Sequence, residues 1–218
     1  MKKIIWILCF LFLVWCSQGD EFIPQENISE TTQMKKIVAL WDSLTAWYWV
    51  DIEQNYPSKL QNKLQENGYN YEIINAWISG DTSDWLISRA SLYLDQNPEI
   101  AILVIGGNDG LRGLSTTNLE ENILEIIDMY EEAWVKVVLW GMDIPMNLWL
   151  TYRNDFRQVY KDVAEVRDKV EFFEFFLDWV AGKSDLNLPD MIHPNPAWYD
   201  IIVGNLYKFL EKNKIITK

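Results

Sequence analysis

The sequence predicts an α/β fold, in which helices cover both faces of a parallel β-sheet. Short apolar runs alternate with longer helical patterns from Lys35 onward. The 218 residues, of which 49% are hydrophobic, suit one ordinary domain with a single core. Strand–helix alternation requires parallel strands whose carboxyl ends share one edge of the sheet, so we expect the functional loops at that edge.

The predicted strands are short apolar runs that end at small or polar residues. They cover residues 36–40, 71–76, 101–106, 135–140 and 170–175. Between them lie helical patterns, the clearest of which covers residues 118–133 and aligns its isoleucines on one face. The last predicted helix runs from about residue 196 to 213. No internal repeat or second domain is evident in the sequence.

Charge and cysteine content exclude several kinds of site. The net charge is −13, and no basic stripe exists to neutralise nucleic-acid phosphates. Both cysteines lie in the first sixteen residues and there is one histidine, which excludes a disulfide and a Cys- or His-rich metal site in the folded part. We therefore expect no nucleic-acid partner, no metal and no organic cofactor. We also expect a monomer.

The N-terminus has the pattern of an export signal. Two lysines precede an apolar run that ends in "LVWC" at Cys16. The run is too short to span a bilayer comfortably. A leucine three residues before the cysteine resembles bacterial lipoprotein signals, although Trp15 replaces the usual small residue. We predict a lipoprotein-type signal peptide over residues 1–16, with lipidation at Cys16, and a polar tether over residues 17–34.

Four chemistry-bearing segments follow the predicted strands in order. They are Asp42–Leu44 after the first strand, Ile78–Asp81 after the second, Gly106–Gly110 after the third, and the pair Asp190 and His193 near the C-terminus. Each segment alone would pass for an ordinary turn or surface position. Their arrangement at successive strand ends indicates one composite site.

These segments resemble the blocks of the SGNH (GDSL-type) hydrolases, in the thioesterase, lysophospholipase and arylesterase branch. That branch typically reads GDSLTAGYG, NAxxSGDT, GGNDGLRG and DxxHP. This chain has WDSLTAWYWV from residue 41, NAWISGDTS from 75, GGNDGLRGL from 106 and DMIHPN from 190. The resemblance runs in collinear order from about residue 36 to 210. It implies a three-layer α/β/α flavodoxin-like sandwich with a central five-stranded parallel sheet over residues 35–218.

The resemblance and local chemistry imply the same catalytic roles. Ser43 would attack an acyl carbonyl, and it needs a neighbouring base to remove its proton. His193 is the single histidine and has a suitable unperturbed pKa, while Asp190 would orient its imidazole. The family takes its oxyanion-hole donors from the positions of Ser43, Gly80 and Asn108.

Other residues of these blocks have supporting roles under the same resemblance. Asp42 is expected to brace the turn that carries the serine. Four residues of the third block are predicted to contact substrate or shape the loop over its acyl chain: Asp109, Leu111, Arg112 and Leu114. Ordinary loop packing explains these four equally well.

The implied function is an exported serine esterase acting on acyl esters or thioesters, such as lysophospholipids or aryl esters. Its expected location is the cell envelope, either lipid-anchored to the outer face of the cytoplasmic membrane or periplasmic. A carbohydrate O-deacetylase of the same family, a non-catalytic envelope binding module using exposed tryptophans, and a cytoplasmic thioesterase are the alternatives.

Twelve tryptophans are far above normal usage, and many stand where the family has glycine. Nine such positions lie in the hydrolase domain: Trp41, Trp47, Trp49, Trp77, Trp85, Trp134, Trp149, Trp179 and Trp198. Some bacteria read UGA as glycine, and translating those codons as tryptophan would produce this pattern. The alternative is that the tryptophans are real, as sugar-stacking platforms or large core residues. Glycine is favoured where the backbone needs positive φ, and a bulky residue there costs about 1–3 kcal/mol.

The recoding hypothesis predicts UGA codons in the gene at these nine positions. Sequencing the gene tests this directly. Finding UGG at Trp41, Trp47 and Trp49 would contradict it.

Overall fold

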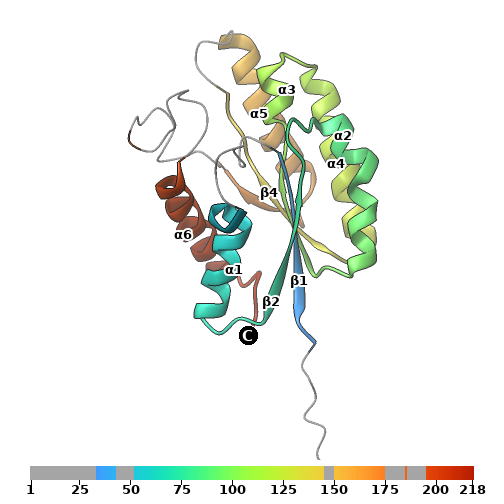
Figure 1. The fold of residues 1–218 in the computed structure, drawn as a ribbon. Coiled ribbons are helices and arrows are strands. Elements are labelled where there is room, and N and C mark those ends of the chain that lie inside the picture. Colours follow the sequence, from blue (N-terminus) through green and yellow to red (C-terminus); the bar gives the residue numbers. More distant parts are fainter. Residues whose placement is uncertain (1–32, 43–51, 145–149, 175–184, 186–194) are drawn as a thin grey trace, which may run out of the picture. The chain divides into compact units, whose positions relative to one another are not determined.

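The computed structural model describes residues 33–42, 52–144, 150–174, 185 and 195–218. The described helices and strands all belong to the unit that begins at Met34. Its centre is a five-stranded sheet in the order β2-β1-β3-β4-β5, with every neighbouring pair parallel (Figure 1). This order confirms the predicted α/β fold, and it is the flavodoxin-like order of a doubly wound sheet.

The strands form where the apolar runs predicted them. Their bounds are β1 Lys35–Trp41, β2 Tyr71–Trp77, β3 Ile100–Val104, β4 Lys136–Trp140 and β5 Glu171–Phe173. The central strand β3 is buried along its whole length, as expected for a parallel strand covered on both faces. The third strand ends at Val104, so Ile105 and Gly106, which the sequence placed in it, belong to the loop that follows.

Helices cover both faces of this sheet (Figure 1). On one face lie α1 (Tyr56–Glu66) and α6 (Pro196–Lys212), which pack against each other. The other face carries α2 (Ser83–Ala90), α4 (Thr116–Glu132) and α5 (Leu150–Val166). Three short elements complete the fold: the 3₁₀ turns η1 (Ile52–Gln54) and η2 (Ser91–Gln96), and the helix α3 (Gly107–Leu111).

Polar caps set the starts of the long helices. The Ser115 side chain accepts a hydrogen bond from the Asn118 backbone N–H, so α4 begins two residues before the predicted start. Asn195 caps α6 in the same way through the Trp198 N–H, ahead of a proline in the first turn. The buried face of α4 carries the isoleucine stripe that the sequence predicted.

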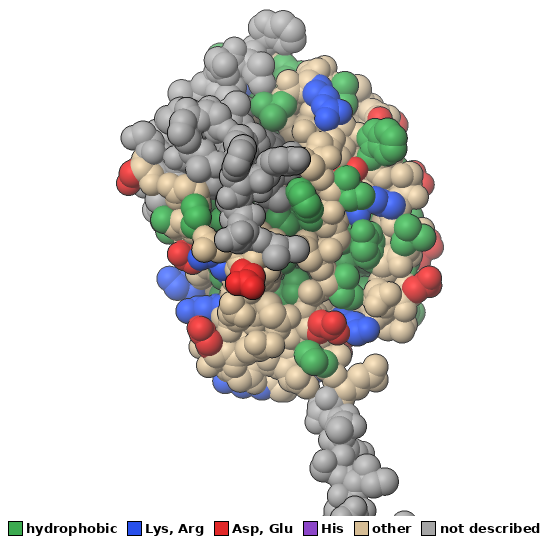
Figure 2. Space-filling model, viewed as in Figure 1, with side chains coloured by type: hydrophobic (Ala, Val, Ile, Leu, Met, Phe, Trp, Pro, Cys, Tyr) green, Lys and Arg blue, Asp and Glu red, His purple; other side chains and the backbone are tan. Residues whose placement is uncertain are grey.

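The described surface is mixed in charge. On the face shown in Figure 2, Lys and Arg side chains lie scattered among acidic and apolar ones. No helix in the described part of the chain is long and apolar enough to cross a membrane.

Five of the nine tryptophans at family glycine positions lie in the described residues: Trp41, Trp77, Trp85, Trp134 and Trp198. Trp41 and Trp198 are buried in the core, whereas the other three are exposed. The centroids of the Trp41 and Tyr56 rings lie 4.9 Å apart. The Trp41 Nε1 donates a hydrogen bond to Asn75 Oδ1 at 2.7 Å. The fold therefore accommodates a large side chain at the end of β1.

Trp134 is the one of these five whose backbone favours glycine. Its φ is +62°, and its side chain is 95% exposed. It follows the end of α4, where its N–H bonds to Glu131 O and the Val135 N–H bonds to Tyr130 O. This is a Schellman helix end, whose left-handed position is most often glycine. The recoding hypothesis stays a prediction, and Trp134 is the described position that supports it through backbone geometry.

We predict that Trp134→Gly stabilises the protein while Trp85→Gly destabilises it. The first change relieves about 1–2 kcal/mol of strain in the left-handed backbone of Trp134. It loses little packing, because the Trp134 side chain is exposed. The second places glycine inside α2 at an exposed position, which costs about 0.5 kcal/mol through lower helix propensity. Urea unfolding followed by circular dichroism measures both. A Trp134→Gly variant no more stable than the parent would contradict the strain argument.

Candidate active site

Two loops meet at the carboxyl edge of the sheet, one after β2 and one after β3. The loop after β2 makes a tight turn in which the Asp81 N–H approaches Ile78 O at 3.4 Å. Gly80 is the third residue of this turn and has φ +76°. A positive φ at that position is the mark of a type II turn, so glycine is required there.

The loop after β3 turns sharply at Gly106, where φ is +104°. A Cβ at this position would lie 2.2 Å from the Tyr160 hydroxyl oxygen. That hydroxyl donates a hydrogen bond to Ile105 O at 2.7 Å, which ties the start of the loop to α5. Glycine therefore allows the chain to turn directly into α3 against α5.

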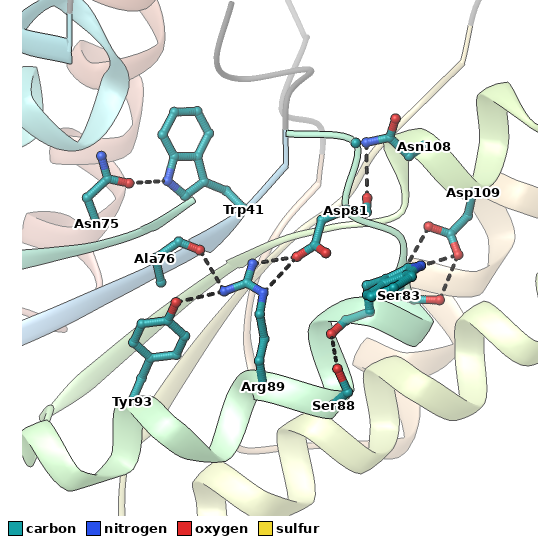
Figure 3. Close-up of polar contacts among 12 residues, drawn as sticks. Trp41, Asn75, Ala76, Asp81, Ser83, Ser88, Arg89, Tyr93, Asn108 and Asp109 are labelled. Atoms are coloured by element: carbon teal, nitrogen blue, oxygen red, sulfur yellow. Dashed lines mark hydrogen bonds and ion pairs between the residues drawn. The ribbon is translucent and has the colours of Figure 1, made fainter. Parts of the chain in front are cut away.

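The side chains of α3 hold the turn that contains Gly80. Asn108 Nδ2 donates a hydrogen bond to Asp81 O at 3.0 Å, and Arg112 Nη2 donates one to Gly80 O at 2.9 Å (Asn108 in Figure 3). Asn108 is buried, and its amide carries two N–H groups. The bond to Asp81 uses one of them.

A buried carboxylate joins the same helix to α2. Asp109 is 2% exposed and accepts hydrogen bonds from the Ser83 N–H at 3.0 Å and from Ser83 Oγ at 2.7 Å (Figure 3). Burial raises the pKa of the Asp109 carboxyl, while the Ser83 bonds oppose that rise. Asn122 Nδ2 also donates to Ser83 Oγ, at 3.0 Å. The start of α2 is thus fixed to both α3 and α4.

An ion pair supports the turn from the other side. The Arg89 guanidinium binds the buried carboxylate of Asp81 through Nε, at 2.9 Å, and through Nη2 (Figure 3). Arg89 Nη1 also donates to Ala76 O at 3.0 Å and to the Tyr93 hydroxyl at 2.8 Å. One guanidinium therefore ties the end of β2 to the turn and to η2.

The structure brings some of the predicted site residues together and leaves others undescribed. Asn108 bonds to the carbonyl of Asp81, the residue after Gly80, so these two predicted positions lie near each other, and their oxyanion role stays a prediction. Ser43, Asp190, His193 and Cys16 lie outside the described residues. Asp42, the residue before the predicted nucleophile, is fully buried.

The four residues predicted to contact substrate occupy different environments. The Asp109 carboxylate is buried and bonded to Ser83, which suits a structural brace. Leu111 packs against the core, Arg112 is exposed, and Leu114 is 37% exposed. Direct substrate contact by these side chains stays a prediction.

Three residues of this network were not identified from the sequence: Ser83, Arg89 and Asn122. Each looks like an ordinary helix residue, and its partners lie elsewhere in the chain. The position of Ser83, three residues after Gly80 in the second block, is the one signal that could have suggested it. In the described residues, no group of three or more acidic, histidine or cysteine side chains could hold a metal ion.

Comparison with known proteins places this site in a known family. A family model described as "GDSL-like Lipase/Acylhydrolase family" matches residues 39–201. Esterase TesA of Pseudomonas aeruginosa is 31% identical over 185 residues, covering 84% of this chain and 92% of that protein. Arylesterase of Vibrio mimicus is 34% identical, covering 90% and 91%. Thioesterase 1/protease 1/lysophospholipase L1 of Escherichia coli K12 is 30% identical, covering 87% and 85%.

Solved structures agree with these relatives. The crystal structure of TesA superposes with a TM-score of 0.77 at 32% identity, covering 82% of this chain and 99% of that one. A psychrotrophic esterase EstA from Pseudoalteromonas sp., in a structure inhibited by monoethylphosphonate, has a TM-score of 0.76 at 29% identity, covering 82% and 97%. The strand order, the two loops at the carboxyl edge and these relatives lead to one conclusion. The chain belongs to the GDSL-like lipase/acylhydrolase family and is a carboxylic ester hydrolase with the SGNH hydrolase fold.

Proposed function

We propose that this esterase works through a Ser43–His193–Asp190 triad and an oxyanion hole built from Ser43, Gly80 and Asn108. The register of β1 carries the proposal. Trp41 pairs with Trp77 on β2 and with Val104 on β3, so the chain that leads to Ser43 leaves the sheet between those two strands. The loops that follow them contain Gly80 and Asn108, and ligands of such sheets bind at this reversal of strand order.

The proposed reaction has two halves. The Ser43 hydroxyl oxygen bonds to the acyl carbon as its proton passes to His193, and the carbonyl oxygen takes the negative charge. When the C–O or C–S bond to the leaving group breaks, His193 returns the proton to the alcohol or thiol. Water then attacks the acyl-serine with His193 as the base, and this releases the carboxylic acid and restores Ser43.

The charged oxygen is the species that the site must stabilise. Backbone N–H groups of Ser43 and Gly80 and the second amide N–H of Asn108 are the proposed donors. Because hydrogen bonds from Asn108 and Arg112 restrain the turn that contains Gly80, the Gly80 and Asn108 donors need little reorganisation during the reaction. Asp190 holds the imidazole in the tautomer that accepts the serine proton.

Acyl esters of small or lipid-like alcohols, and thioesters, are the proposed substrates. The names of the relatives in this family, an esterase, an arylesterase and a thioesterase/lysophospholipase, support that range. Leu111 and Leu114 are the proposed apolar contacts for the acyl chain, since both belong to the segment that carries Asn108 and continues beyond it. We further propose that the enzyme is monomeric and is exported, with Cys16 as a lipid anchor; the signal-like N-terminus supports the export and the anchor.

We predict that Ser43→Ala abolishes ester hydrolysis. Losing the nucleophile should lower kcat for short- and medium-chain nitrophenyl esters on the order of 10⁴-fold or more. The parent should also be labelled once by an ethylphosphonate probe, at Ser43, and the variant should not. Peptide mass spectrometry identifies the labelled residue. Turnover or labelling that persists in Ser43→Ala would overturn the proposed nucleophile.

The control is the same measurement in two full-length forms. One is the chain as printed, and the other has glycine at all nine family glycine positions. Activity in the glycine form alone would support recoding together with the triad. Activity in both forms would show that the tryptophans are tolerated, and the codons alone would then decide the recoding question.

We predict that Cys16 carries a lipid in the native cell. The parent should incorporate radiolabelled palmitate and partition with membranes, and Cys16→Ser should do neither. The other cysteine gives a matched control, because Cys9→Ser lies within the signal and should leave incorporation unchanged. Equal labelling of parent and Cys16→Ser would contradict the anchor.

A further inference from the structure

Arg112 lies at the end of α3, one helical turn after Asn108. Its backbone N–H bonds to Asn108 O at 3.2 Å, and its side chain reaches back to Gly80 O at 2.9 Å. Residues four apart lie on the same helix face. Asn108 and Arg112 therefore bind two successive carbonyls of the turn, those of Asp81 and Gly80.

The carbonyl that Arg112 binds belongs to a residue with little conformational restraint of its own. Gly80 lacks a side chain and has φ +76°, and its carbonyl and its N–H lie in the two peptide planes that meet at its Cα. A hydrogen bond that fixes the carbonyl plane therefore limits the rotation about Cα by which the N–H could turn away. A Cβ at Gly80 would lie 3.4 Å from Arg112 Nη2, which is ordinary van der Waals contact. The guanidinium thus lies directly against the glycine that the proposed mechanism uses as a donor.

We propose that Arg112 is a positioning residue that orients the Gly80 N–H for the developing oxyanion. The inference rests on the proposed function and deepens it. Asn108 already acts on the same turn from the buried side, so Arg112 completes the restraint from the exposed side. One short helix then supplies an oxyanion donor and also holds a second donor in place.

This role makes a different kinetic prediction from substrate contact. A residue that binds the acyl chain or head group raises KM when removed, whereas one that orients a transition-state donor lowers kcat. The expected effect is modest because the bond is exposed and screened by solvent. Loss of one such hydrogen bond corresponds to about a 3- to 10-fold fall in kcat.

The test compares three variants of the full chain: Arg112→Met, Arg112→Lys and Arg167→Met. Methionine keeps an unbranched apolar chain and removes the donor, whereas lysine can still donate to Gly80 O. Arg167 is a matched control, since its guanidinium binds Asp128 at 2.8 Å and it precedes β5, away from the carboxyl edge. The readouts are kcat and KM for a nitrophenyl ester, the rate of phosphonylation by the ethylphosphonate probe, and circular dichroism.

Arg112→Met should lower kcat and the phosphonylation rate together by about 3- to 10-fold, with KM within about two-fold of the parent. Arg112→Lys should recover most of this loss, and Arg167→Met should match the parent. A rise in KM without a fall in kcat would overturn the positioning role in favour of substrate contact, and unchanged kinetics would overturn it outright. Ser43→Ala in the same series distinguishes failure of the proposed mechanism from failure of the Arg112 proposal. Turnover in Ser43→Ala would overturn the mechanism itself.

Discussion

The rest of the site depends on one set of hydrogen bonds, by which side chains in and next to α3 restrain the turn after β2. Within five residues of sequence, Asn108 and Arg112 bind two carbonyls of the turn, and Asp109 binds the start of α2. Each of these bonds joins one part of the chain to another, so they restrain the turn through the protein's own groups. Burying the Asp109 carboxylate is costly, and the hydrogen bonds from Ser83 offset part of that cost.

The sheet determines where this arrangement can act. The order β2-β1-β3 places the end of β1 between the two loops, and the connections on either side of it run to opposite faces. The last residue of β1, Trp41, therefore lies between the ends of the strands that lead into those loops. The proposed nucleophile, two residues beyond Trp41 in the sequence, would need no long loop to reach the proposed donors, which is why the Asp-Ser-Leu segment is informative in this fold.

Sequence patterns predicted the strands and the two loops at their carboxyl ends because these depend on local properties. Apolar runs predict buried strands, and Gly80 and Asn108 stand in motifs only a few residues long. The supporting network was missed because its bonds join residues far apart: Ser83 meets Asp109 across 26 positions and Asn122 across 39. The tryptophans show a second limit of the sequence patterns, because a family glycine position does not reveal whether a large side chain can fit there. Trp41, at a family glycine position, is buried with a hydrogen-bonded indole, and Trp134 alone of the five described has left-handed backbone.

The most direct test of the account is the effect of Asn108→Ala on kcat. Removing its amide should lower kcat about 100- to 1000-fold, as expected for one oxyanion-hole donor, with little change in KM. Circular dichroism and urea unfolding should show that the variant stays folded, although loss of the bond to Asp81 O lowers its stability. A folded Asn108→Ala enzyme with the kcat of the parent would contradict the claim that α3 supplies a donor to the oxyanion hole.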